Sequence, residues 1–401
     1  MQPATENMQP AAEKPRIFSR PPFPGFTTEW TARAEEILPA VDADRDKSEA
    51  NRASSPEVYE RMAELGLHRM FVSRALGGGQ APLPAGMGAI ELIARHDASV
   101  AWQIGVQGAI GRITDYLPED SARTVFSRHD KLVVGSVHPT GTAEKVPGGY
   151  RLSGRWGFAS GFAGAAWLVS AARITNGGTA DEVRMLFTPV TEVKPLDTWY
   201  TTGLAATASH DYEIDDVFVP EAHTVDNAAL VAPPPRRASR AYGIGYYDFG
   251  PFLAAATVLG IAGQALDLFT ELALSKIPSE GKATLGNSHT VQDRLARAHA
   301  GVRSAHCLVA DAVRHAERSG ETGGDELSAL IRLACATAAE NATVAVDAIC
   351  EMSGATSSYR AHRLERCFRD LHTVVKHIQL ASTNFEMVGQ YLLGGGLQTR
   401  R

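Results

Sequence analysis

Residues 153–161 decide the fold of this chain, and they read Ser-Gly-Arg-Trp-Gly-Phe-Ala-Ser-Gly. The stretch combines two aromatic side chains, three glycines and Ser160 directly before an apolar run at Trp167. Glycines let a flat ligand approach the backbone, an indole offers a stacking face, and a hydroxyl offers one directed hydrogen bond. Trp156, Phe158 and Ser160 are therefore candidate ligand contacts. The alternative is a strand edge with a packed tryptophan.

Short β-type runs surround this stretch. They lie at residues 132–134, 150–152, 167–172, 184–187 and 212–214, separated by Gly-Gly, Asn-Gly-Gly and proline. The spacing predicts a β domain over residues 131–235. Three successive prolines near its end exclude helix there.

Helical periodicity flanks the β domain on both sides. Residues 27–130 carry apolar side chains at helical spacing, and Ser55 stands as an N-cap before Pro56 at the first helical position. Residues 236–401 hold four or five long patterns rich in alanine and leucine. Residues 1–26 are proline-rich and predict a disordered or extended tail. The expected fold is mostly α with a central β domain.

Composition excludes several classes of protein. A formal charge of -6 and a pI near 6.1 give no basic footprint for nucleic acid or an anionic membrane, so we expect a small-molecule partner. No run of about 18 apolar residues or signal-like start is apparent, which favours a cytoplasmic protein with no membrane partner. The four cysteines form no Cys-x-x-Cys pair, and we expect no metal site.

A charged segment with two histidines occupies residues 366–378. On a helix, Asp370, Val374 and His377 fall on one stripe, whereas His372 and His377 lie about 140° apart and cannot converge on a metal as an i, i+4 pair would. The simplest interpretation is a basic helix end that complements the helix dipole.

Other polar and aromatic clusters leave their role open. Residues 199–211 form a polar loop rich in hydroxyl groups, whose alternative role is in turns. His138 lies in a short Val-Gly-Ser-Val-His-Pro sequence and is equally a plain loop histidine. Aromatic residues crowd the junction between the β domain and the next helix, where they could line a flat substrate pocket or pack the interface: Tyr242, Tyr246, Tyr247 and Phe249.

Four features in this order resemble one family. Helices precede a β domain that carries the 153–161 sequence, then comes Ile-Asp-Asp-Val-Phe-Val-Pro at residues 214–220, and a bundle ends in Arg-Asp-Leu-His at residues 369–372. Over about residues 30–395 the chain resembles the acyl-CoA dehydrogenase fold. The resemblance implies an N-terminal helical domain, a middle β-barrel domain and a C-terminal helical bundle. The Phe-Ala-Ser-Gly turn and the Arg-Asp-x-His-x4-His pattern resemble the flavin monooxygenase branch, the oxygenase components of two-component hydroxylases.

One position separates this chain from the dehydrogenase branch. Dehydrogenases typically place a glutamate base eight residues after the Asp of Arg-Asp, and that position here is Ile378. Isoleucine cannot abstract a proton. His377 precedes it, and in the monooxygenase branch a histidine here lies beside flavin and substrate, where its near-neutral pKa suits proton transfer or hydrogen bonding.

The resemblance also implies roles for individual residues. Ser160 is expected to hydrogen-bond the flavin near N5, Trp156 and Phe158 to pack against its rings, and His377 to face the substrate. The catalytic candidates are thus His377 and Ser160. The expected cofactor contacts are Trp156, Phe158, Ser160, Ser136, Thr207, Ser209 and Gln292, and the expected substrate contacts are His138, Tyr246, Tyr247 and Phe249.

The cofactor and partners follow from the same resemblance. Residues 291–296 resemble the helix that approaches the adenylate half of FAD across a subunit interface, but the Arg and Phe that usually precede it are missing. Reduced FMN is therefore as acceptable as reduced FAD. No Gly-x-Gly-x-x-Gly follows a strand, which argues against NAD(P)H binding, and we expect reduced flavin to come from a separate reductase. A homotetramer is the family expectation.

The leading hypothesis is a monooxygenase that uses reduced flavin and O2, through a C4a-hydroperoxyflavin, to hydroxylate an aromatic, heteroaromatic or amine-bearing metabolite. The alternative is a dehydrogenase or oxidase acting on an acyl thioester, with Glu386 or Asp248 as a substitute base. A third hypothesis is a flavin-binding scaffold without catalysis.

Overall fold

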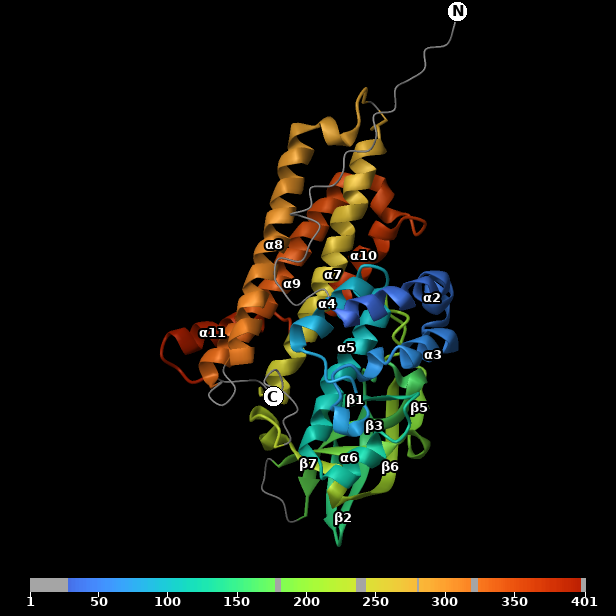
Figure 1. Ribbon diagram of the computed structural model, residues 1–401, viewed down its shortest axis with the longest axis vertical. Helices are drawn as coiled ribbons and strands as arrows, with labels where there is room; N and C mark the ends of the chain where they lie inside the picture. Colours follow the sequence, from blue (N-terminus) through green and yellow to red (C-terminus); the bar gives the residue numbers. More distant parts are fainter. Residues whose placement is uncertain (1–27, 177–181, 236–242, 280, 319–323, 398–401) are drawn as a thin grey trace, which may run out of the picture.

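Most of the helices form the upper part of the protein, and a twisted sheet lies in its lower part (Figure 1). The computed structural model describes residues 28–176, 182–235, 243–279, 281–318 and 324–397. The predicted tail over residues 1–26 and Tyr242 lie outside the described residues.

The N-terminal helices begin where capping side chains place them. Ser55 accepts a hydrogen bond from the backbone N–H of Val58 with Pro56 at the first helical position, which confirms that predicted start. Asp97 caps the next long helix by accepting from the N–H groups of Ser99 and Val100. The helices are α2 (Glu29–Asn51), α3 (Pro56–Glu64), α4 (Leu83–Ala94), α5 (Ala98–Ile113) and α6 (Glu119–Val125).

Seven strands form one mixed sheet in the order β5-β6-β2-β1-β3-β4-β7. They are β1 (Leu132–Val146), β2 (Gly149–Trp156), β3 (Ala165–Thr175), β4 (Val183–Pro189), β5 (Lys194–Leu196), β6 (Asp211–Pro220) and β7 (Thr224–Asp226). Only the β1–β3 pairing is parallel among the described strands. The sheet is open, with β5 and β7 at its edges, so the barrel implied by the resemblance is not confirmed.

The C-terminal helices form a bundle around a long central helix. They are α7 (Tyr246–Ser275), α8 (His289–Arg318), α9 (Asp325–Ser353), α10 (Arg363–Val374) and α11 (Thr383–Leu392). Helix α7 packs on α4 and α5 on one side and on α9 and α10 on the other, so it joins the two helical regions. A Cβ atom on Gly260 of α7 would lie 2.4 Å from the carbonyl oxygen of Glu91, and only glycine permits this close approach of α4.

Two helices have the length and apolar composition of a membrane span. Residues 249–266 of α7 carry no charged side chain, which corrects the expectation that no such run exists. The mean hydropathy reaches 1.7 in α7 and 1.3 in the segment Asp325–Ser358. Within these windows 83% and 56% of the residues are buried inside the protein, and buried core helices have the same properties.

Helix α5 connects the sheet to the bundle. It packs on β1 and on α7, and the side chain of Gln107 accepts a hydrogen bond from the N–H of Val133 at the start of β1. All but one of its sixteen residues are buried. A helix held on both sides in this way can present a side chain to the space between sheet and bundle.

A buried ion pair joins α4 to α8. His306 Nε2 lies 3.0 Å from Glu91 Oε1 and His306 Nδ1 lies 3.0 Å from the carbonyl oxygen of Val302, so the protonated imidazole donates to both. Burial and the charge of Arg95 oppose this charge, but Glu91 and the two hydrogen bonds outweigh them and raise the pKa of His306 above 6.5.

Removing either member of this pair is expected to lower the free energy of unfolding by about 3 kcal/mol, because the remaining group is left buried without its partner. The stabilisation from His306 is fully present below pH 6.5 and is lost as the pH rises through the raised pKa. Denaturant titrations of wild type, His306→Gln and Glu91→Gln at several pH values measure both effects. Arg297→Gln, which removes an exposed pair with Asp293, is the control and should cost less than about 0.5 kcal/mol. Equal losses in all three variants would contradict the prediction.

Candidate functional site

Three buried hydroxyl groups from two separate loops meet in a chain of hydrogen bonds. Ser160 Oγ lies 2.7 Å from Ser209 Oγ, and Ser209 Oγ lies 2.6 Å from Thr207 Oγ1. Thr207 Oγ1 then donates to the carbonyl oxygen of Leu204 at 2.8 Å. The structure thus brings together three of the predicted cofactor contacts, and none of the three is more than 4% exposed.

Trp102 of α5 connects this series of hydrogen-bonded hydroxyls to His377. Its indole Nε1 donates to Ser160 Oγ at 3.2 Å, and its ring meets the imidazole of His377 edge to face, with centroids 5.2 Å apart. We call the series Trp102, Ser160, Ser209 and Thr207 the hydroxyl relay. Sequence reasoning missed Trp102, since it lies in an ordinary buried helix with no motif around it.

His377 lies in a turn beyond the end of α10. The helix ends at Val374, so the prediction that Asp370, Val374 and His377 share a helical stripe is wrong for His377. The N–H of Gln379 approaches His377 Nδ1 at 3.4 Å, and we assign the ring proton to Nε2 on this basis. His377 is exposed in the single chain, and desolvation by the protein groups near its ring lowers its pKa to about 4. The imidazole is therefore neutral near pH 7.

A cluster of charges fixes the elements that carry the site. Arg366 of α10 binds Asp97, the N-cap of α5, at 2.8 Å and lies 3.6 Å from Asp370. Asp370 accepts a hydrogen bond from the N–H of Leu204 at 2.7 Å, in the loop that carries Thr207 and Ser209. Burial raises the pKa of Asp370 to about 6, although Arg366 and the Leu204 N–H act in the opposite direction. The Arg-Asp pair of the sequence thus positions a loop and a helix.

The same loop lies directly on α10. A Cβ atom on Gly203 would come within 2.1 Å of the carbonyl oxygen of Arg369, so the contact requires glycine. Arg369 also binds Glu49 of α2 at 2.8 Å and donates to the carbonyl oxygen of Thr202. Three helices and one loop are therefore joined by these few groups.

The two aromatic candidates of the 153–161 stretch occupy opposite environments. Trp156 is fully buried, stacks on Tyr212 with centroids 5.5 Å apart, and donates from Nε1 to the carbonyl oxygen of Ala171 at 2.7 Å. Its burial, its stacking and its hydrogen bond match the packed-tryptophan alternative. Its position does not support a flavin contact. Phe158 is 73% exposed, adopts a φ of 65°, and contacts Trp199 edge to face. It is the aromatic ring available beside Ser160.

Other predicted cofactor contacts lie apart from the relay. Ser136 pairs with Ser170 in the sheet, where the β1–β3 register shifts before Gly141, and the exposed His138 lies within that irregular segment. Among the described hydrogen bonds none links Ser136 or His138 to Ser160. Gln292 is exposed near the start of α8, where its Nε2 donates to the carbonyl oxygen of Gly286 at 2.8 Å. The end of the bundle at which α8 begins lies on the side away from the sheet (Figure 1).

The aromatic cluster at the start of α7 fills the interior. Tyr246 and Phe249 are at most 4% exposed, and Phe249 packs edge to face on Phe71. Tyr247 is partly exposed and donates from its hydroxyl to Asn227. This arrangement matches the interdomain packing alternative, so the prediction that Tyr246 and Phe249 line a substrate pocket is not supported.

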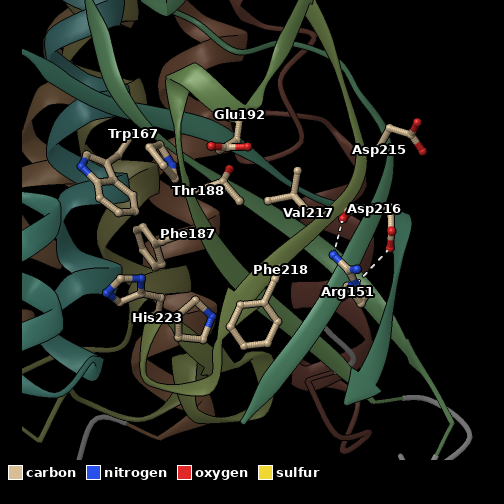
Figure 2. A pocket seen from close by; sticks show the side chains of 12 residues that line it. Arg151, Trp167, Phe187, Thr188, Glu192, Asp215, Asp216, Val217, Phe218 and His223 are labelled. Atoms are coloured by element: carbon tan, nitrogen blue, oxygen red, sulfur yellow. Dashed lines mark hydrogen bonds and ion pairs between the residues drawn. The ribbon is translucent and has the colours of Figure 1, made fainter. Parts of the chain in front are cut away.

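A pocket of about 530 Å³ opens in the β domain, away from the relay. Figure 2 shows Trp167, Phe187 and His223 along one side, with Arg151 bound to Asp216 on the other. No residue of the relay and no part of residues 366–378 lines it. The pocket is therefore separate from the candidate site.

Two family models match the chain. The model described as "Acyl-CoA dehydrogenase, N-terminal domain" matches residues 31–144, and that described as "Acyl-CoA dehydrogenase, C-terminal domain" matches residues 252–382. Together they cover more than half of the chain.

Similar proteins extend the match over nearly the whole length. An FADH(2)-dependent resorcinol hydroxylase, oxygenase component, from Rhizobium sp. is 28% identical, covering 87% of this chain and 90% of its own. An indole-3-acetate monooxygenase from Pseudomonas putida is 26% identical over 88% and 92%. The structure of XiaF from Streptomyces sp. with FADH2 has a TM-score of 0.87 at 22% identity, covering 92% and 96%. The similar proteins are named as monooxygenases or oxygenase components, and the chain belongs to the acyl-CoA dehydrogenase family.

Proposed function

We propose that this chain is the oxygenase component of a two-component flavin-dependent monooxygenase. It accepts reduced FAD or FMN from a separate reductase and uses O2 to hydroxylate an aromatic, heteroaromatic or amine-bearing small molecule. The names of the similar proteins support the reaction class and the use of reduced flavin.

The observation that carries the proposal is the junction at Trp102. It brings a buried hydroxyl, Ser160, and a neutral imidazole, His377, into contact with one indole. A carboxylate base for an acyl thioester is not part of this junction, because Ile378 is 58% exposed hydrocarbon and Asp370 is bound to Leu204 and Arg366. Hydrogen-bonding groups without net charge suit a neutral aromatic substrate.

The residues around the relay fit a flavin. Ser160 Oγ retains acceptor capacity beyond its two contacts, and Phe158 offers an exposed ring two residues away. Glycines on either side, at positions 157 and 161, allow a flat ring to approach the backbone. Ser160 would hold the isoalloxazine edge and Phe158 would cover it. When bound, the reduced flavin supplies the electrons that activate O2.

His377 is assigned to the substrate. Because its pKa is about 4 and Nδ1 faces the N–H of Gln379, Nε2 carries the proton at neutral pH and can donate to a substrate oxygen or nitrogen. Trp102 fixes the orientation of the imidazole ring by its edge contact. The exposed imidazole is accessible to a small molecule that approaches the surface beside Trp102.

The dehydrogenase alternative requires Glu386 or Asp248 as a base, and the positions of these two carboxylates give it little support. Glu386 is exposed on α11. Asp248 accepts a hydrogen bond from Ser328 Oγ at 2.6 Å, in the region where α7 meets α9. Neither carboxylate has a hydrogen bond to the relay among the described residues.

Anaerobically reduced FMN or FAD mixed with the protein and then with O2 should give a transient absorbing species that is neither reduced nor oxidised flavin, because the site shields its contents from water. Stopped-flow absorbance measures its lifetime. Reoxidation as fast as for free flavin would contradict the proposal. Reduction of the protein's oxidised flavin by an acyl-CoA in the absence of O2 would support the dehydrogenase alternative.

His377→Ala should lower product formed per reduced flavin by about 100-fold, the usual worth of a positioned proton-transfer or hydrogen-bonding group. The Kd of reduced flavin should change less than about two-fold. His372→Ala is the matched control, since His372 lies on α10 and binds Asp347 instead. Between pH 6 and 8 the wild-type yield should show no titration of His377, and it should fall as the pH approaches 4. Equal losses of product and flavin binding would refute the role assigned to His377.

We also propose that four copies of the chain assemble. Large apolar side chains remain exposed on the helical bundle, among them Val344, Leu392 and Leu393, the last at 91%. Light scattering on the full chain is expected to give four times 42.9 kDa. A mass of 42.9 kDa would contradict this assembly.

A further inference from the structure

We propose that the hydroxyl relay has a single direction, and that this direction makes Ser160 a hydrogen-bond acceptor toward flavin, so that the site prefers the reduced over the oxidised cofactor. The inference rests on the proposed function in taking the ligand to be a flavin. It assigns Thr207 and Ser209 as positioning residues that act through Ser160.

The two ends of the relay have fixed roles. The indole Nε1 of Trp102 carries a hydrogen and has no lone pair to offer, so it can only donate to Ser160 Oγ. At the other end the carbonyl oxygen of Leu204 can only accept, and it takes the hydroxyl hydrogen of Thr207 at 2.8 Å. Both ends therefore impose the same direction.

The direction of the two middle contacts follows from one hydrogen on each hydroxyl. Because the Thr207 hydrogen lies on Leu204, the 2.6 Å contact with Ser209 must use the hydrogen of Ser209. The 2.7 Å contact between Ser209 and Ser160 must then use the hydrogen of Ser160. Hydrogen bonds run from Trp102 to Ser160, to Ser209, to Thr207 and to Leu204.

No titrating side chain disturbs this order. Among the described residues, the side chains that hydrogen-bond to the three hydroxyls are only those of the relay itself. None of these groups gains or loses a proton near neutral pH. The direction is thus a property of the folded protein at all working pH values.

Ser160 consequently offers a lone pair and no hydrogen to a ligand. The N5 atom of a reduced flavin carries a hydrogen and can donate to that lone pair, whereas N5 of an oxidised flavin has only a lone pair of its own. For Ser160 to donate to oxidised N5, the three hydroxyl hydrogens must reverse while Trp102 continues to donate to Ser160. Reversal removes the hydrogen bond from Thr207 to Leu204.

The strength of the preference follows from what reversal loses. The Leu204 carbonyl oxygen also accepts a hydrogen bond from Trp199 Nε1 at 3.1 Å. It therefore keeps one hydrogen bond when Thr207 no longer donates to it. The loss is one net neutral hydrogen bond, which corresponds to a roughly five-fold preference.

The test is to remove the fixed end of the relay. In Thr207→Val, Ser209 loses its acceptor, can donate to Ser160, and frees Ser160 to donate to oxidised flavin. The ratio of Kd for oxidised to Kd for reduced FMN, and the same ratio for FAD, should fall roughly five-fold from wild type. The midpoint potential of the bound flavin should fall by about 20 mV, since ten-fold corresponds to about 30 mV for two electrons. Both are measured by anaerobic titration of the full chain, without substrate turnover.

A matched control and a second variant keep the outcomes separate. Thr201→Val removes a similar threonine contact in the same loop, to the carbonyl oxygen of Gly203, and should leave the ratio unchanged. Ser209→Ala should change the ratio in the same direction as Thr207→Val, and it carries the test if Thr207→Val loses its native circular dichroism. Wild-type protein that binds flavin, with an unchanged ratio in these variants, overturns the direction of the relay alone. Wild-type protein that binds neither FMN nor FAD in either oxidation state overturns the proposed function as well.

Discussion

The ion cluster centred on Arg366 holds the candidate site together. Its guanidinium binds the N-cap of α5 through Asp97 and faces Asp370, whose other oxygen holds the N–H of Leu204. The helix carries Trp102 and the loop carries the last two hydroxyls of the relay, so both halves of the relay depend on one arginine. Buried charges are tolerated here because each has a partner, and loss of a partner would leave its neighbour desolvated.

The site that this cluster positions is itself uncharged. An indole, three hydroxyls and a neutral imidazole offer directed hydrogen bonds without a fixed field, which suits a flat ligand whose charge changes little on binding. The charged groups Arg366 and Asp370 lie outside this set of residues. They orient the Leu204 loop and the start of α5. Ile378 stands where the resemblance to dehydrogenases implies a carboxylate, and its hydrocarbon side chain offers no proton-accepting atom.

The direction of the relay illustrates why hydrogen positions matter for cofactor chemistry. Ser160 alone is both donor and acceptor and cannot discriminate between oxidation states of a flavin. Its neighbours decide the outcome, because a donor-only indole and an acceptor-only carbonyl lie at the two ends. A serine in a motif thus acquires a defined role from residues far from it in sequence.

The sequence by itself determined the order of helices, sheet and bundle, the start of α3 at Pro56, and the candidates Ser160, Thr207, Ser209 and His377, because period, caps and short patterns are local properties. It did not determine that Trp156 and Phe249 are core residues. The identity of an aromatic residue does not show whether its ring packs on a ligand or on another side chain, as Trp156 does on Tyr212. It placed His377 on a helix that ends at Val374, and it gave no sign of Trp102. Only the tertiary structure decided these points, because contacts among α5, the 199–210 loop and the end of α10 join residues separated by more than a hundred positions, and long-range packing leaves no periodic trace in the chain.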